Sequence, residues 1–135
     1  MAALFLHGCA VYVAYGLYRT VMDINETLTL VDSSLIRIQG VLNEGKNLRR
    51  AAEDGKLIST LAEKIPSYIQ DEVEIVTKEK ITTLSGALKL SSLDFTESAK
   101  EEDLPGATKA FNDMSSTYND FTDLMDDLSD TAVKP

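Results

Sequence analysis

The sequence has little of the chemistry that most catalytic and metal sites use. It contains one cysteine, one histidine and no tryptophan in 135 residues. The lone Cys9 cannot form an intramolecular disulfide bond, and Cys9 and His7 lie too close together to supply a usual zinc ligand set. No nucleophile motif and no glycine-rich phosphate loop occurs. These absences predict a protein that is not an enzyme and that has no metal site.

Basic residues are also scarce. The chain has 13 Lys and Arg against 22 Asp and Glu, which gives a net charge of -9. No basic cluster is longer than Arg49-Arg50, and nucleic-acid binding depends on cations that neutralise phosphates, so nucleic acid is excluded as a partner. The 44% of hydrophobic residues is enough for the core of one small domain.

Strand patterns and prolines are few, which predicts an all-α fold. Alternation with a period of two never runs far, and proline occurs only at positions 66, 105 and 135. A stripe with steps of four and three predicts a helix from residue 23 that continues towards residue 52, with Gly55 as its stop. This stripe consists of Ile24, Leu28, Val31, Leu35, Ile38 and Leu42. Pro66 marks the next boundary, because proline starts a helix well but cannot continue one.

Residues 67–100 allow two interpretations. One apolar stripe, Ile69 to Val76, is offset by about one residue from a second stripe that includes Ile81, Leu88 and Phe95. We favour two helices with a tight turn at residues 77–80, although one long helix that drifts around its axis also fits. A clear break follows, with Asp103 as the expected N-cap and Pro105 in the first turn of the last helix.

The last helix has the most regular pattern in the chain. Its stripe steps four and three throughout and consists of Ala107, Phe111, Met114, Tyr118, Phe121, Met125 and Leu128. Such spacing is typical of a helical bundle. Since the loops are short, we expect an up-and-down bundle of three or four helices over residues 23–130, followed by a flexible tail at 131–135.

Aspartates recur on another face of this helix. Asp120, Asp123, Asp127 and Asp130 are three and four residues apart. The favoured interpretation is a solvated acidic face, and the alternatives are contact with a basic partner or with a divalent cation. Nothing matches an EF-hand loop.

The N-terminal stretch differs sharply in composition. No formal charge occurs before Arg19, which argues against a signal peptide with a basic n-region. The length of residues 1–22 predicts a transmembrane helix, with a buried helix of a soluble bundle as the alternative. Gly8 and Gly16 would allow close packing on another membrane helix. His7 is expected to hydrogen bond to a neighbouring helix or headgroup, and in a pigment-bearing complex it could instead ligate the magnesium of chlorophyll.

Two stretches carry a family resemblance. "IPSYIQDEV" at residues 65–73 is similar to the start of a family helix, and "LDFTESAKEEDLPGATKAF" at residues 93–111 is similar to the stretch where one helix ends and the last begins. Over residues 48–128 the chain therefore resembles the PsbQ-like extrinsic subunits of photosystem II, which are small four-helix proteins on the lumenal side of the thylakoid membrane.

The resemblance implies a structural role. We expect a membrane-anchored accessory or linker subunit of a photosystem and its antenna, in the thylakoid membrane of a chloroplast, with the bundle on the lumenal side. Its partners would be core or antenna subunits and membrane lipid. No cofactor is required, although chlorophyll or carotenoid could bind at the membrane helix. The expected contact residues are Gly8, Tyr12 and Gly16 in the membrane and Asp120, Asp123 and Asp127 on the bundle. A membrane-anchored sensory module and a helical adaptor, both unrelated to photosynthesis, are the alternatives.

Overall fold

A computed structural model describes the chain path of residues 2–133 and the side chains of residues 14–131. This part of the chain forms four α-helices and two 3₁₀ segments and contains no β-strand, so the predicted all-α fold is confirmed. The elements are α1 (Ala2–Glu44), η1 (Leu48–Ala51), α2 (Ala52–Lys64), η2 (Ile65–Tyr68), α3 (Ile75–Lys100) and α4 (Leu104–Val133).

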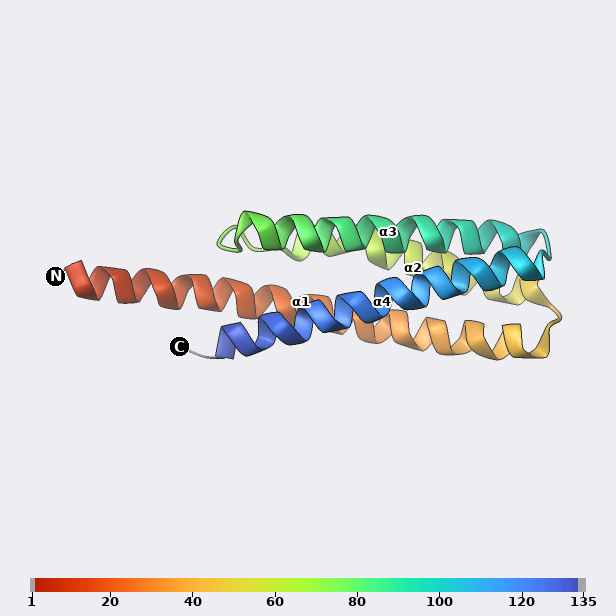
Figure 1. The fold of residues 1–135 in the computed structure, drawn as a ribbon, viewed down its shortest axis with the longest axis horizontal. Coiled ribbons are helices and arrows are strands. Elements are labelled where there is room, and N and C mark those ends of the chain that lie inside the picture. Colours follow the sequence, from red (N-terminus) through yellow and green to blue (C-terminus); the bar gives the residue numbers. More distant parts are fainter. Residues whose placement is uncertain (1, 134–135) are drawn as a thin grey trace.

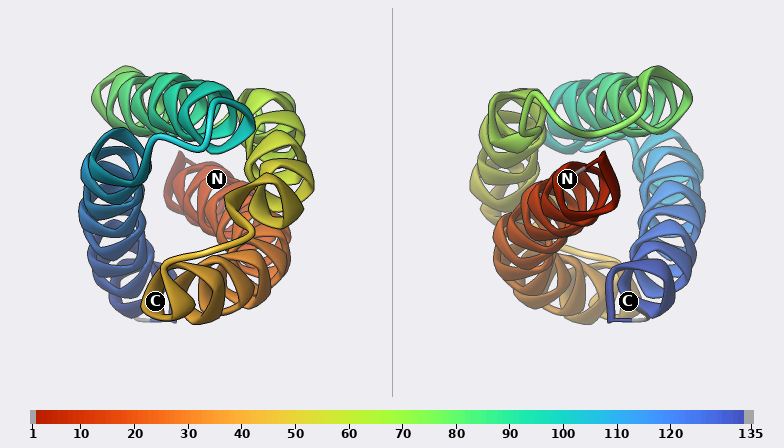
Figure 2. Two further views of the ribbon diagram at one scale, coloured as in Figure 1. Left: turned by 90° about the vertical axis from the view of Figure 1, so that its right-hand side faces the viewer. Right: turned by 90° about the vertical axis from the view of Figure 1, so that its left-hand side faces the viewer.

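The four helices form an up-and-down bundle. Each helix runs antiparallel to the one before it, and α1 also packs against α4 and closes the ring (Figure 1). The end-on views of Figure 2 show α1, α2, α3 and α4 in this order around a common centre. Short connections explain the arrangement, because they place successive helices side by side in opposite directions.

Helix α1 is a single uninterrupted helix of 43 residues. The helix therefore continues across residues 22 and 23, where we expected the transmembrane helix to end and the bundle to begin. The predicted end near residue 52 was also wrong, because α1 ends at Glu44. Gly45 has a φ of 68°, and its N–H donates to the carbonyl oxygens of Val41 and Leu42 at 3.2 and 3.1 Å. A left-handed glycine at this position ends the helix and satisfies its last carbonyls.

Gly55 does not end a helix, contrary to our prediction. It lies inside α2, where it is buried against α3. A Cβ atom at this position would lie 2.8 Å from Cδ1 of Phe95 and 3.4 Å from the carbonyl oxygen of Ser92. Gly55 therefore allows α2 and α3 to approach closely. Pro66, by contrast, lies in η2 directly after α2, as predicted.

The expected turn at residues 77–80 was wrong. A single helix, α3, runs from Ile75 to Lys100, and the irregular segment lies earlier, at residues 69–74. The apolar stripe from Ile69 to Val76 led to a wrong prediction because its members have different environments. Val73 is buried in the loop, whereas Val76 on α3 is 60% exposed.

The start of α4 confirms the prediction for Asp103 and Pro105. The Oδ1 atom of Asp103 accepts a hydrogen bond from the backbone N–H of Gly106 at 3.1 Å. This bond caps one of the free N–H groups of the first turn. Pro105 follows in that turn, where its missing N–H costs nothing.

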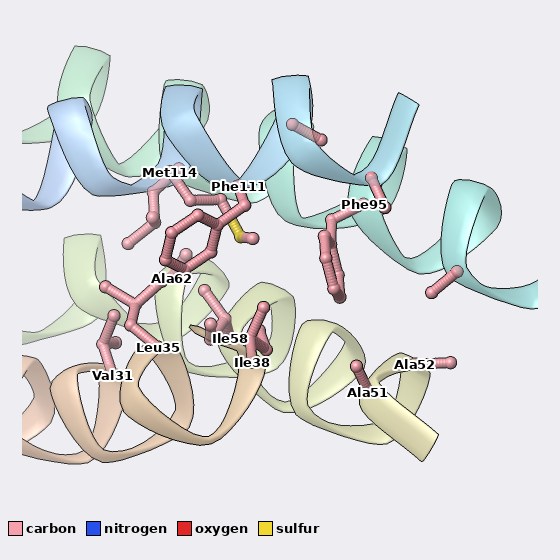
Figure 3. Close-up of a cluster of buried hydrophobic side chains, with 14 residues drawn as sticks. Val31, Leu35, Ile38, Ala51, Ala52, Ile58, Ala62, Phe95, Phe111 and Met114 are labelled. Carbon is pink, nitrogen blue, oxygen red and sulfur yellow. The ribbon is translucent and has the colours of Figure 1, made fainter. Parts of the chain in front are cut away.

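The core consists of two neighbouring clusters. The larger cluster lies towards the α1–α2 connection, and the stripes of α1 and α4 meet there across Ile58 and Ala62 of α2 (Figure 3). The smaller cluster lies towards the other end of the bundle and is built around Ile24, Ile81 and Phe121. The stripe residues predicted for α1 and α4 are buried or partly buried in these clusters, so both predicted helix faces are confirmed.

Candidate functional site: the end of the bundle from which α1 projects

Helix α1 reaches beyond the bundle. Its N-terminal part extends past the end of α4 and past the loop between α2 and α3, which lie together at the same end of the molecule (Figure 1). The sequence of this part carries no formal charge before Arg19. The side chains of His7, Gly8 and Tyr12, for which we predicted pigment or partner contacts, lie outside the described residues.

The loop at residues 69–74 binds α1 where the helix enters the bundle. The backbone N–H of Gln70 donates to Oγ1 of Thr20 at 3.0 Å. The same hydroxyl donates to the carbonyl oxygen of Gly16 at 2.9 Å. Thr20 is fully buried, and both of its hydrogen-bonding functions are satisfied within the chain. This contact fixes the loop on α1.

Gly16 is part of the same contact. A Cβ atom at this position would lie 2.6 Å from Oε2 of Glu72 and 3.1 Å from its Cβ. The small size of Gly16 therefore allows a contact inside this chain. Because this contact buries Gly16, the residue has no free surface for the partner contact that we expected. No sequence pattern indicates this role, because Glu72 is 56 residues away along the chain.

This packing changes the interpretation of residues 1–22. Among the residues that the structure describes, no helix combines the length and the hydropathy needed to cross a membrane. The expected transmembrane helix is wrong for its C-terminal part, because Thr20 and Val21 are buried in the bundle. Tyr15 and Tyr18 on the same helix are 61% and 50% exposed.

Acidic groups surround this end of the bundle. Asp71 and Glu74 are exposed on the α2–α3 loop, and Asp126, Asp127 and Asp130 are exposed near the end of α4. Two basic groups here are engaged: Arg19 pairs with Asp23 at 3.6 Å, and Nζ of Lys78 donates to the carbonyl oxygen of Asp71 at 3.1 Å. We call the five exposed residues Asp71, Glu74, Asp126, Asp127 and Asp130 the acidic end. It would repel an anionic surface and attract a basic one.

The predicted aspartate contacts lie on the outer side of α4. Asp120, Asp123 and Asp127 are exposed, and none of the three forms an ion pair with another described side chain. Asp113 is paired with Lys109 at 3.2 Å. No group of His, Cys, Asp and Glu side chains that could hold a metal ion occurs within residues 14–131, so the structure gives no support to a cation site on α4.

The pKa of the Tyr118 hydroxyl is clearly shifted from its ordinary value. Tyr118 lies between the two core clusters. Burial, with a smaller contribution from the charge of Asp32, raises the pKa of its hydroxyl above the ordinary value. A tyrosine with a raised pKa is deprotonated less often at neutral pH and is less available as a base or nucleophile, so we attribute this shift to its place in the core.

Comparisons with protein-family models, with curated proteins and with solved structures gave no match to this chain.

Proposed function

We propose that this chain is a non-catalytic accessory subunit that binds a larger membrane complex through the N-terminal part of α1. The observation that carries the proposal is the continuity of α1. One helix leads from an uncharged N-terminal sequence outside the bundle into the core, where Ile24, Leu28 and Val31 are buried. An apolar helix that projects from a small bundle gains free energy when a partner covers it, by about 25 cal/mol per Å² of apolar surface.

The partner surface that suits this end is a protein groove with basic edges. Residues 2–15 rise about 21 Å along a helix, which is less than the roughly 30 Å of a hydrocarbon core. The acidic end surrounds the same region and disfavours contact with anionic lipid headgroups. Lys and Arg on a partner protein would complement it. Because α1 is continuous, such binding also fixes the orientation of the bundle on its partner.

The resemblance to PsbQ-like subunits supports a photosystem and its antenna as this complex. On this proposal the chain lies at the thylakoid membrane with the bundle on the lumenal side. His7 belongs to the binding segment and is the proposed ligand if a chlorophyll is bound there. A lower chlorophyll content of the complex with His7→Leu, at unchanged subunit content, would support that role, and equal pigment content would exclude it.

The proposal is tested in native membranes. We would solubilise them in mild detergent, separate the complexes on a sucrose gradient and locate the chain by peptide mass spectrometry. Migration in fixed ratio with a chlorophyll-bearing band is expected. Migration at the top of the gradient, away from pigment, would exclude the photosystem.

A pair of glycine variants tests the binding segment. Gly8→Leu adds a side chain to the N-terminal part of α1 and should release the protein from its complex. Gly40→Leu is the matched control, because Gly40 is exposed on the same helix and a Cβ atom added there would meet nothing within 4 Å. Equal retention of both variants would exclude close packing through Gly8.

A soluble helical adaptor is the second candidate. The burial of one side of α1 between residues 20 and 38 in its own bundle favours it over a sensory module, because this side of the helix already has partners within the chain. An adaptor would stay monomeric without detergent, whereas the accessory subunit is expected to need detergent or its complex. Sedimentation of the purified full chain with and without detergent separates the two.

A further inference from the structure

A groove runs between the outer sides of α3 and α4. It consists of two recesses that follow each other along the same sides of both helices. The first is lined by Val76, Glu79, Lys80, Thr83, Leu84 and Leu124. The second is lined by Ala87, Leu90, Ser91, Asp94, Asp113, Ser116 and Thr117. From Val76 to Asp94 helix α3 rises about 27 Å, so this α3–α4 groove is long enough for a helix of about five turns.

The α3 side of the groove lacks charge over most of its length. Leu90 and Val76 are 65% and 60% exposed. Between residues 81 and 93 the only charged residue is Lys89, and its Nζ lies 3.1 Å from Oε1 of Glu63 on α2, away from the groove. The solvent side of a surface helix normally carries charged and polar residues. An apolar, uncharged side is typical of a surface that another molecule covers.

Gly86 strengthens this interpretation. A Cβ atom there would meet no atom within 4 Å, so nothing in the bundle requires a glycine. Glycine inside a helix nevertheless destabilises it relative to alanine. Its neighbours Thr83 and Ala87 are small and exposed as well. Together the three residues allow the backbone of another helix to approach α3 closely.

The α4 edge of the groove is acidic. Asp113 lines the groove, and Asp120 follows it two turns later on the exposed side of α4. Glu79 and Asp94 add carboxylates from α3. The nearby cations are Lys80 and Lys109, and Lys109 is paired with Asp113. The groove therefore combines an apolar side with an edge that carries excess negative charge.

We propose that the α3–α4 groove binds an amphipathic helix of a partner protein. This helix lays small and apolar residues along α3 around Gly86 and directs Lys or Arg towards Asp120 and Asp94. Charge complementarity selects this occupant, since the acidic edge attracts cations while the uncharged side of α3 offers apolar contact. The surface is separate from the N-terminal part of α1, so the proposal does not depend on the proposed function.

A second copy of the chain fits the groove less well. Two grooves packed face to face would bring the aspartates of both α4 helices to one interface. Each chain carries a net charge of -9, so association would add like-charge repulsion without a matching row of cations.

The test uses the full chain and two designed helical peptides of about 18 residues, the length that matches the groove. Both peptides carry an Ala and Leu stripe. One flanks the stripe with Lys and the other with Glu. Fluorescence anisotropy gives the affinity, and amide chemical shifts give the binding site. We expect the Lys peptide to bind at least about tenfold more tightly than the Glu peptide, with shifts concentrated on residues 76–94 and 113–124.

Two matched pairs of variants locate the contact. Leu90→Glu should weaken the Lys peptide by about tenfold or more, whereas Ile36→Glu should change binding by less than about twofold. Leu90 and Ile36 are both 65% exposed, on α3 and α1 respectively, so neither variant should unfold the bundle. Asp120→Asn should weaken binding by about threefold, and Asp126→Asn, on another side of α4, should not. Equal effects within either pair, equal binding of the Glu peptide, or shifts elsewhere on the bundle would overturn the proposal.

Discussion

Helices α3 and α4 are neighbours of similar length, with 26 and 30 residues, yet only their inner sides are alike. Both bury a phenylalanine completely, Phe95 on α3 and Phe121 on α4. Their outer sides differ, because α4 exposes a series of aspartates while α3 carries one charge between residues 81 and 93. The inner sides build the bundle, which requires only apolar packing. The outer sides are free of this requirement, so their difference indicates what each helix meets outside the bundle.

The similarity of the inner sides leads to the largest expected effect. Phe95→Ala and Phe121→Ala should each lower the free energy of unfolding by about 3–5 kcal/mol, because each leaves a cavity in a closely packed core. Urea unfolding followed by circular dichroism measures the loss. Leu90→Ala is the control on the outer side of α3 and should change stability by less than about 0.5 kcal/mol. A loss for Leu90→Ala as large as that for Phe95→Ala would contradict the distinction between inner and outer sides.

Replacing glycine by alanine should have opposite effects on stability at the inner and outer sides of α3. Gly55→Ala on α2 pushes a methyl group against the inner side of α3, where Phe95 is fully buried and cannot move aside. We expect a loss of about 1–3 kcal/mol. Gly86→Ala on the outer side meets no atom and should raise stability by about 0.5–1 kcal/mol. Thermal and urea unfolding of both variants give the signs, and two effects of the same sign would show that the environments do not differ as described.

The two helices also begin differently. Asp103 caps α4, whereas Glu74 at the start of α3 makes no side-chain capping hydrogen bond. Asp103→Ala should therefore lower the free energy of unfolding by about 1 kcal/mol, and Glu74→Ser should raise it by about 0.5–1 kcal/mol. Urea unfolding measures both. If Asp103→Ala left stability unchanged, the contact with Gly106 would not be a functioning cap.

The smallest expected effect concerns the raised pKa of Tyr118 on the inner side of α4. The unfolded chain loses this proton from about pH 10, before the folded protein does. The contribution of Tyr118 to stability is therefore present below about pH 10 and is lost as the pH rises through the higher folded pKa. Tyr118→Phe should show a smaller decrease of stability above pH 10 than the unchanged protein. Identical pH profiles from urea unfolding would show that burial does not act on this group.

Periodicity was sufficient to predict the faces of α1 and α4. Residues such as Val31 and Met114 are spaced to lie on one side of a helix, and burial follows from the hydrophobic effect. Local chemistry likewise predicted the start of α4, because the capping carboxylate and its N–H are only three residues apart. The turn in residues 67–100 was misplaced because positions 73 and 76 are both valine, yet Val73 is buried and Val76 is exposed. Their difference depends on which neighbours the tertiary fold provides.

The candidate site was only partly accessible to prediction. The absence of charge before Arg19 identified the N-terminal part of α1, and spacing identified Asp120, Asp123 and Asp127. Nothing in the sequence connects Gly16 with Glu72 or Thr20 with Gln70, since these pairs are distant along the chain. The α3–α4 groove was missed for the same reason. Its two sides come from different helices, and only their packing makes one surface.

The sequence by itself determined the all-helical class, the inner faces of the first and last helices and the acidic charge, because each depends on composition or on contacts within a few turns. Tertiary structure decided where the N-terminal apolar stretch enters the bundle, which glycines are needed for close packing and which exposed residues share a surface. These features depend on contacts between residues far apart in the chain. Their geometry is fixed only when the four helices pack against one another.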